Sequence, residues 1–104
     1  LVGNPAVGSS SYLGCKAYLE KMTKVWAIEN GRFRITSNSI SPAFMQTSMT
    51  AGFDNRLVDQ MTKEHPLKEL LPLEDVASCT LFLAETTNHI NGQDFLINAG
   101  QSVR

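Results

Sequence analysis

The sequence predicts an α/β fold that forms part of a larger parallel sheet. Helical patterns and short β-type segments follow each other in the order helix, strand, helix, helix, strand. Two strands joined through helices are typical of a right-handed parallel crossover. Two parallel strands alone make a poor sheet, because parallel sheets are normally buried on both faces. The 104 residues are therefore expected to be one part of a single α/β domain.

The first helix is predicted over residues 12–30, which carry the strongest periodicity of the chain. Charges of alternating sign at i, i+4 intervals mark an exposed face, and Ser9 to Ser11 supply candidate N-caps. We expect Asn30-Gly31 to end the helix, with Gly31 in the left-handed conformation. The apolar side chains that predict an amphipathic helix are Cys15, Tyr18, Leu19, Met22, Val25 and Trp26.

The remaining elements are predicted from β-formers, turn residues and helix signals. Segment 32–41 is expected to be a strand that Pro42 stops, and segment 94–98 a second, shorter strand. A short helix is expected over 55–64, ended by His65-Pro66. A third helix should begin near Pro72, with acidic residues in its first turn.

Composition excludes several functional classes. The net charge is −1 and the basic residues are spread along the chain, so neither nucleic acid nor an anionic membrane is an expected partner. No apolar run approaches the roughly 20 residues of a membrane-spanning helix. The chain starts with Leu1 and shows no signal-peptide pattern, so the start is expected to be a cut through a longer protein.

Cysteine and histidine positions predict no metal site. Cys15 and Cys79 form no CxxC arrangement, so we expect two free, buried thiols in a reducing compartment such as the cytoplasm. A single disulfide between them is the less favoured alternative. His65 and His89 lack ligand partners at a recognisable spacing, and both are expected on the surface.

Tyr12 and Lys16 are the main candidates for chemistry. Their i, i+4 spacing near a helix start places both side chains on one face. A phenol is a poor proton donor or acceptor at neutral pH, but a neighbouring ammonium group favours the phenolate form. Such a pair suits general acid–base catalysis on a carbonyl or an alcohol. The alternative is an ordinary surface pair, which the spacing alone favours.

A resemblance to a known family changes that weighting. Segment 12–16, Tyr-Leu-Gly-Cys-Lys, resembles the Tyr-x-x-x-Lys motif of the short-chain dehydrogenase/reductase family. The helical segment after Lys16 is similar to the family's long catalytic helix. Segment 34–43 resembles the strand that ends in the family's Pro-Gly turn, and Thr47 falls where the Pro-Gly-x-x-x-Thr motif places its threonine.

The resemblance continues to the end of the chain. Segment 72–77, Pro-Leu-Glu-Asp-Val-Ala, resembles the start of the family's last large helix. Segments 90–93 and 98–100 resemble its closing Thr-Gly-Gln and Asp-Gly-Gly motifs. One such motif is weak evidence for membership of the family, whereas five motifs in the family's order along the chain are strong evidence. The fold implied is the C-terminal part of a Rossmann-like, doubly wound parallel sheet, with residues 1–104 forming the C-terminal half of one domain.

The resemblance implies roles for particular residues. Tyr12 would be the acid that protonates the carbonyl oxygen, or the base in the reverse direction, and Lys16 would bind the nicotinamide ribose and favour the phenolate. The segment from Pro42 to Phe44 and the Thr47 hydroxyl would hold the nicotinamide end of NAD(P)(H). Without the family match, Pro42 would be a strand terminator and Thr47 an N-cap. The implied substrate pocket is lined by Phe44, Met45 and Met49; packing of these residues on the protein's own core is equally compatible with the sequence.

The departures from the family pattern concern the other half. The Gly-rich dinucleotide loop, the catalytic Asn and the catalytic Ser all belong upstream of Leu1, and Ala43 replaces the usual Gly. Activity is therefore expected to require an N-terminal half that binds the cofactor.

The expected function is interconversion of a carbonyl and a secondary alcohol by an NAD(P)(H)-dependent enzyme, with a 3-oxoacyl thioester or similar ketone as the commonest substrate by analogy. A homodimer or homotetramer is expected. The first alternative is a non-catalytic structural subunit or fragment of the same fold. The second is an extended-type epimerase or dehydratase, which the short stretch after Lys16 argues against. The choice between NAD and NADP lies outside these residues.

Overall fold

The computed structural model describes residues 9–45, 52–85 and 89–103. Along the chain, α1 spans Ser10–Asn30, a short 3₁₀ helix η1 spans Gly31–Phe33 and β1 spans Ser39–Pro42. They are followed by α2 over Asn55–Glu64, α3 over Leu73–Glu85 and β2 over Asp94–Ile97. This order confirms the α/β class and places the three helices within two residues of their predicted starts.

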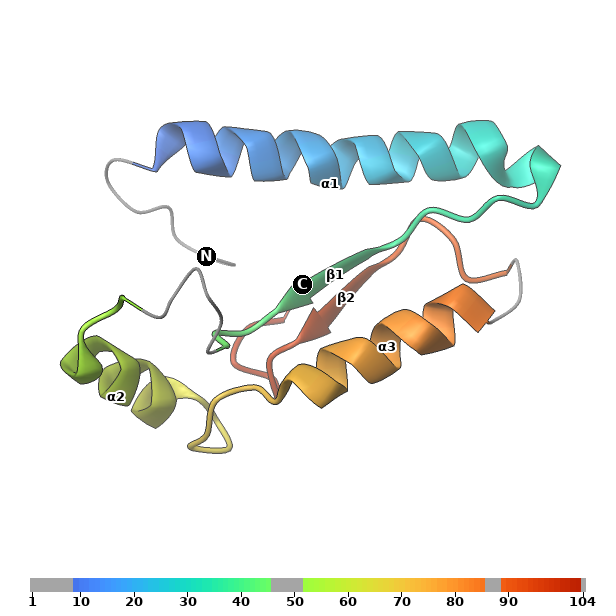
Figure 1. Ribbon diagram of the computed structural model, residues 1–104. Coiled ribbons are helices and arrows are strands. Elements are labelled where there is room, and N and C mark those ends of the chain that lie inside the picture. The colour runs from blue at the N-terminus through green and yellow to red at the C-terminus, as the bar shows by residue number, and fades with distance from the viewer. Residues whose placement is uncertain (1–8, 46–51, 86–88, 104) are drawn as a thin grey trace.

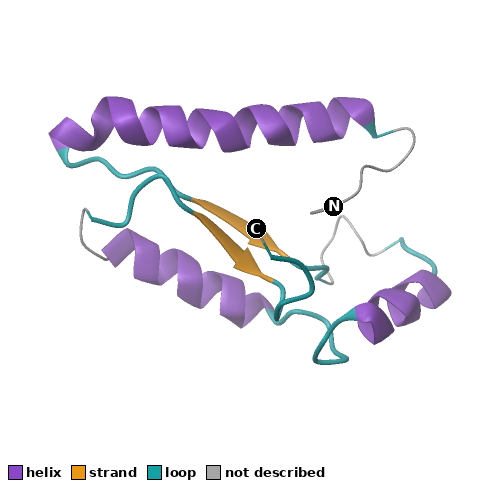
Figure 2. Ribbon diagram, turned by 180° about the vertical axis from the view of Figure 1, so that it is seen from behind, coloured by secondary structure: helices purple, strands orange, loops and turns teal. Residues whose placement is uncertain are grey.

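The two strands pair in parallel, as the helical connection between them requires. Ser39 lies opposite Asp94, and Pro42 lies opposite Ile97. In Figures 1 and 2, α1 runs along one side of the strand pair and α3 along the other. The carboxyl ends of both strands point toward α2 and the start of α1 (Figure 1). The described residues thus form a helix–sheet–helix arrangement. The carboxyl ends of the two strands lie at the edge of the sheet nearest to α2 and the start of α1.

The segment between α1 and β1 differs from the prediction. Gly31 has right-handed helical angles (φ −57°, ψ −35°), and the left-handed residue is Arg34 at φ 61°. The Arg34 N–H donates to the Gly31 carbonyl and the Ile35 N–H to the Asn30 carbonyl. The strand predicted from Arg32 therefore begins only at Ser39, because the chain first completes a 3₁₀ turn and then reaches β2.

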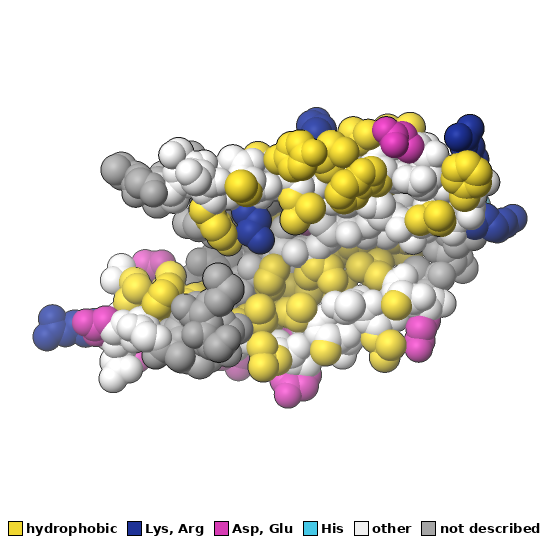
Figure 3. Space-filling model, turned by 45° about the horizontal axis from the view of Figure 1, so that its top comes forward, with side chains coloured by type: hydrophobic (Ala, Val, Ile, Leu, Met, Phe, Trp, Pro, Cys, Tyr) yellow, Lys and Arg dark blue, Asp and Glu magenta, His cyan; other side chains and the backbone are white. Residues whose placement is uncertain are grey.

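The core within the described residues is thin. Ala27 and Leu71 are the only hydrophobic residues there that are buried. The predicted apolar face of α1 is largely exposed: Tyr18 is 67% exposed, and Trp26 is also exposed. Figure 3 shows hydrophobic side chains gathered along α1 and above the hollow beneath it. The residues of α1 that are buried against the rest of the chain are Thr23 and Ala27.

The cysteine prediction is half right. Both thiols are free, but Cys15 is exposed and Cys79 is half-buried. No helix among the described residues is long and apolar enough to cross a membrane.

One end of α1 is held to the sheet by the turn before β2. The Asn91 side-chain amide donates to the Ala27 carbonyl, while its Oδ1 accepts from the Ser37 N–H at 2.8 Å. Gly92 adopts φ +73° there, and a Cβ on it would lie 3.3 Å from the Ala27 Cβ. The positive φ favours glycine at this position, and the short distance shows that the Asn91-Gly92 turn packs closely against α1 at Ala27.

Candidate active site

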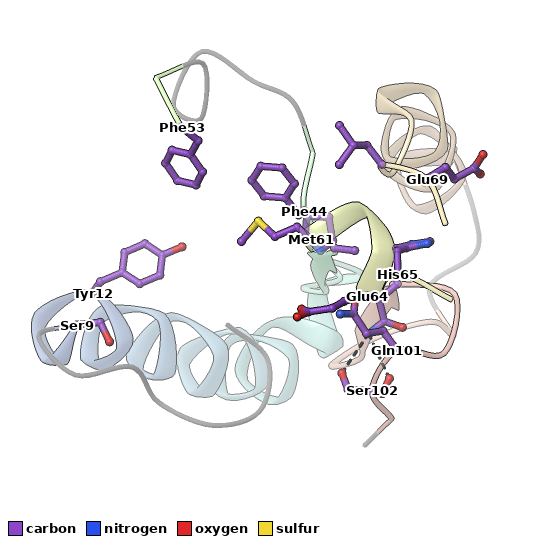
Figure 4. A pocket seen from close by; sticks show the side chains of 14 residues that line it. Ser9, Tyr12, Phe44, Phe53, Met61, Glu64, His65, Glu69, Gln101 and Ser102 are labelled. Atoms are coloured by element: carbon purple, nitrogen blue, oxygen red, sulfur yellow. Dashed lines mark hydrogen bonds between the residues drawn. The ribbon is translucent and has the colours of Figure 1, made fainter. Parts of the chain in front are cut away.

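An open cavity of about 740 Å³ lies at the carboxyl ends of β1 and β2. Its walls come from the start of α1, the end of β1, the end of α2 with the loop that follows, and the segment after β2 (Figure 4). Segments far apart in the sequence therefore converge on one space. In open parallel α/β sheets this edge is where ligands bind.

Tyr12 and Lys16 lie together in the first turns of α1. Tyr12 lines the cavity, is 49% exposed, and its hydroxyl points across the cavity toward Phe44 and Met61 (Figure 4). The Lys16 Nζ lies 5.5 Å from the centroid of the Tyr12 ring. The helix therefore brings an ammonium group beside a phenol whose hydroxyl faces open space.

The segment after β1 forms the opposite wall. Pro42, Ala43 and Phe44 line the cavity, and the Ala43 N–H continues the sheet by donating to the Ile97 carbonyl at 2.8 Å. The Phe44 carbonyl accepts from the Leu71 N–H, which ties this wall to the start of α3. The Phe44 ring stacks on Phe53 with centroids 5.8 Å apart.

Three further predicted site residues are not placed in the cavity by the described residues. Met45 follows Phe44 and is half-buried, but it is not among the described residues that line the cavity. Thr47 and Met49 lie outside the described residues. Their assignments to the nicotinamide and to the substrate remain predictions.

The sequence of the chain was compared with known protein families and curated proteins. A family model described as enoyl-(acyl carrier protein) reductase matches residues 3–102. The chain belongs to the short-chain dehydrogenase/reductase family. The family name therefore applies to nearly the whole chain, including every cavity segment described above.

Two curated proteins illustrate which members of the short-chain dehydrogenase/reductase family the chain resembles. A 3-oxoacyl-[acyl-carrier-protein] reductase FabG from Staphylococcus epidermidis is 35% identical over 100 residues, which are 95% of this chain and 40% of the relative. A human (3R)-3-hydroxyacyl-CoA dehydrogenase is 37% identical, with 95% of this chain and 38% of the relative covered. The chain thus spans about two fifths of the length of these relatives.

His65 is a cavity residue that the sequence prediction placed wrongly. It was expected on the surface, but it is only 5% exposed, because the chain turns back over it between α2 and α3. Its Nδ1 accepts from the Leu67 N–H at 3.1 Å, so the neutral ring carries its proton on Nε2. That Nε2 is buried and has no hydrogen-bond partner in the part of the chain that the structure describes. His89 is exposed, as expected.

Other cavity residues gave weaker sequence signals. Asn98 is buried, donates to the Ser102 carbonyl and Oγ, and accepts from the Gly100 N–H. Its motif position was recognised, but its place in the cavity was not. Glu64 and Glu69 also line the cavity and were not predicted there, because a charged residue at a helix end or in a loop is normally only solvated.

Proposed function

We propose that this chain is the substrate-side half of an NAD(P)(H)-dependent oxidoreductase that interconverts a carbonyl and a secondary alcohol. The observation that carries the proposal is the position of Tyr12. Its hydroxyl faces an open cavity at the carboxyl ends of two parallel strands, with the Lys16 ammonium beside its ring. The match to the short-chain dehydrogenase/reductase family supports a catalytic role for that pair over a surface one.

The residues present fit the nicotinamide end of a dinucleotide. The Pro42–Phe44 segment forms an ordered cavity wall, because Ala43 and Phe44 each use one backbone group to bond to β2 or to Leu71. Thr47 completes this segment in the proposal. When bound, the nicotinamide supplies or accepts the hydride. The rest of the dinucleotide would be held by the N-terminal part of the protein, which the longer relatives possess.

Tyr12 is proposed to move the proton. In the reductive direction its O–H bond breaks and the proton goes to the substrate oxygen; in the oxidative direction the phenolate takes the proton from the alcohol. Lys16, beside the Tyr12 ring, would hydrogen-bond the ribose hydroxyls of the bound dinucleotide. Phe44, Met45 and Met49 are proposed to line the substrate side.

The proposal extends to the architecture of the complete protein. Residues 1–104 would be the C-terminal half of one Rossmann-like domain, with further strands beside β1 making the sheet doubly wound. The exposed apolar side chains of α1, among them Tyr18 and Trp26, would pair across a two-fold axis in a homodimer or homotetramer. The two free cysteines fit a reducing compartment, and we propose the cytoplasm.

Hydroxyl removal tests the catalytic assignment. In the full-length protein Tyr12→Phe should lower kcat by at least about a hundredfold, the lower range for a positioned acid–base group, with NAD(P)H affinity nearly unchanged. Tyr18→Phe is the matched control, because it removes the same hydroxyl from a side chain of the same helix that does not line the cavity. Steady-state assays with a ketone panel and fluorescence titration of NAD(P)H measure both quantities. Wild-type turnover by the Tyr12 variant would favour a non-catalytic role for this fold.

A further inference from the structure

Aromatic side chains gather on the wall of the cavity that faces Tyr12. Phe44 follows β1 and Phe53 lies just before α2, yet both rings line the same cavity as Tyr12. In Figure 4 the Phe44 and Phe53 rings and the tip of the Met61 side chain lie around the space that the Tyr12 hydroxyl faces. Three aromatic rings therefore border the place where the proposed proton transfer would occur.

The Phe44 and Phe53 rings lie nearly parallel but are offset. Their centroids are 5.8 Å apart and the angle between their planes is 18°. Carbon atoms of two directly superposed rings would lie about 3.5–4.0 Å apart, so neither ring here covers the other. Phe53 is also 40% exposed, which leaves part of its surface open to a further group. Aromatic pairs prefer this offset geometry, and a third ring can extend the stack in the same way.

The side chains beside these rings also suit an aromatic group. Met61 lines the cavity from α2, and a thioether makes favourable contacts with an aromatic ring. Pro42 and Leu70 add apolar surface to the same cavity. Small-molecule sites hold the apolar body of a ligand against such a wall, while a few polar groups fix its orientation. In the proposed function Tyr12 is the polar group that holds the reacting oxygen.

We infer that the substrate of the proposed reaction carries an aromatic ring beside its reacting carbonyl or alcohol group, and that this ring stacks on Phe44 and Phe53. The inference rests on the proposed function, because the Tyr12 hydroxyl places the reacting oxygen and thereby the rest of the substrate. Phe53, which was not among the predicted site residues, becomes a specificity-determining residue. This substrate class differs from the acyl substrates that the names of the relatives specify.

The test compares two ketones that differ only in the ring. Benzylacetone carries a flat phenyl ring, whereas its ring-saturated analogue carries a puckered cyclohexyl ring. In both, carbon atoms separate the ring from the carbonyl, so the reacting group is the same. Full-length protein is assayed with each ketone, with NADH and with NADPH. The kcat/KM for benzylacetone is expected to be at least about threefold higher, because aromatic pairs attract each other beyond the burial of their area.

Three variants assign the preference to Phe53. Phe53→Leu keeps an apolar side chain but removes the ring, so the ratio of the two kcat/KM values should fall below about twofold. Phe53→Tyr keeps the ring and should keep the ratio. Phe82→Leu is the matched control, because it makes the same change at a side chain of α3 that is 56% exposed and does not line the cavity. It should leave the ratio unchanged.

The outcomes separate the two proposals. A wild-type ratio near one would overturn the inference. A Phe53→Leu variant that slows both ketones equally would also overturn it, since the rings would then only order the cavity wall. An equal fall in the ratio for Phe82→Leu would overturn the role of Phe53. In each case, reduction of either ketone or of ethyl acetoacetate would leave the proposed oxidoreductase function intact. If protein that binds NAD(P)H reduces none of the three ketones, the proposed function itself is wrong and the inference falls with it.

Discussion

The two ends of the strand pair are built in opposite ways. At the amino end, which we call the anchored end (residues 27, 37–39 and 90–93), side chains and backbone bond closely. Asn38 donates to the Ile90 carbonyl and accepts from the Gln93 N–H, and Asn91 bridges Ala27 and Ser37. The carboxyl end, which we call the open end, is lined by the cavity residues. There the segments are separated by the cavity, and the His65 Nε2 has no hydrogen-bond partner among the described residues.

This difference shows which contacts the chain makes by itself. Asparagine side chains satisfy the backbone groups of the anchored end, so α1 is fixed there without help from another segment. The open end has exposed apolar rings and a buried donor without an acceptor. Polar groups of this kind are normally paired in a complete protein. At the open end, therefore, groups remain that the proposed cofactor or substrate would contact.

The largest expected effect comes from studying residues 1–104 alone. Within the described residues β1 pairs only with β2, which leaves one edge of each strand without a backbone partner. Unpaired edges and exposed apolar side chains such as Ile28, 83% exposed, favour association. We expect the isolated chain to be unstable or aggregated and to bind no nicotinamide cofactor. Thermal unfolding, light scattering and NAD(P)H titration of the purified chain measure this.

The opposite result would change the comparison. A monomeric, cooperative transition well above room temperature would show that the anchored end suffices to hold the fold. Even complete domains are stable by only about 5–15 kcal/mol, so a chain with two buried hydrophobic residues in its described part is not expected to reach that. Such an outcome would also strengthen the non-catalytic alternative.

A smaller effect is expected from two glycine substitutions in the full-length protein. Gly92 and Gly100 both have positive φ, +73° and +83°, so alanine costs about 1–2 kcal/mol of backbone strain at either. Only at Gly92 would the new Cβ meet another residue, the Ala27 Cβ at 3.3 Å. Gly92→Ala should therefore lower the free energy of unfolding more than Gly100→Ala does. Equal losses in urea unfolding would mean that α1 is not held closely at the anchored end.

The anchored end was the more predictable of the two from sequence. The periodicity of 12–30, the Asn91-Gly92 turn and the β-formers of 94–98 are local signals, and they gave α1 and β2 nearly to the residue. α2 was predicted with the same bounds that the structure has. β1 was predicted seven residues too early, from Arg32 instead of Ser39, because a 3₁₀ turn and a left-handed residue at Arg34 precede the strand.

At the open end, the roles of the candidate residues could be predicted only through the family motifs. Tyr12 and Lys16 share a helix face, so their proximity follows from spacing alone. The burial of His65 and the position of Glu64 depend on how the loop between α2 and α3 folds over the strand ends, which no local pattern encodes. The apolar stripe of α1 was recognised correctly as apolar, but its burial requires partners that these residues do not supply.

The smallest expected effect concerns His65 and tests whether the open end is complete. His65→Phe removes two polar groups: Nδ1, which accepts from the Leu67 N–H, and Nε2, which is buried without a partner. The first loss is modest, because Leu67 is 63% exposed and water can bond its N–H. The second change removes an unsatisfied buried donor, which itself costs about 1–3 kcal/mol.

The two effects oppose each other, so the free energy of unfolding of the full-length protein should change by less than about 1 kcal/mol, as a net hydrogen bond contributes only about that much. Urea unfolding at neutral pH measures the change. A loss above about 2 kcal/mol would contradict this and would mean that Nε2 has an acceptor outside the described residues, since breaking such a buried bond leaves that acceptor unpaired.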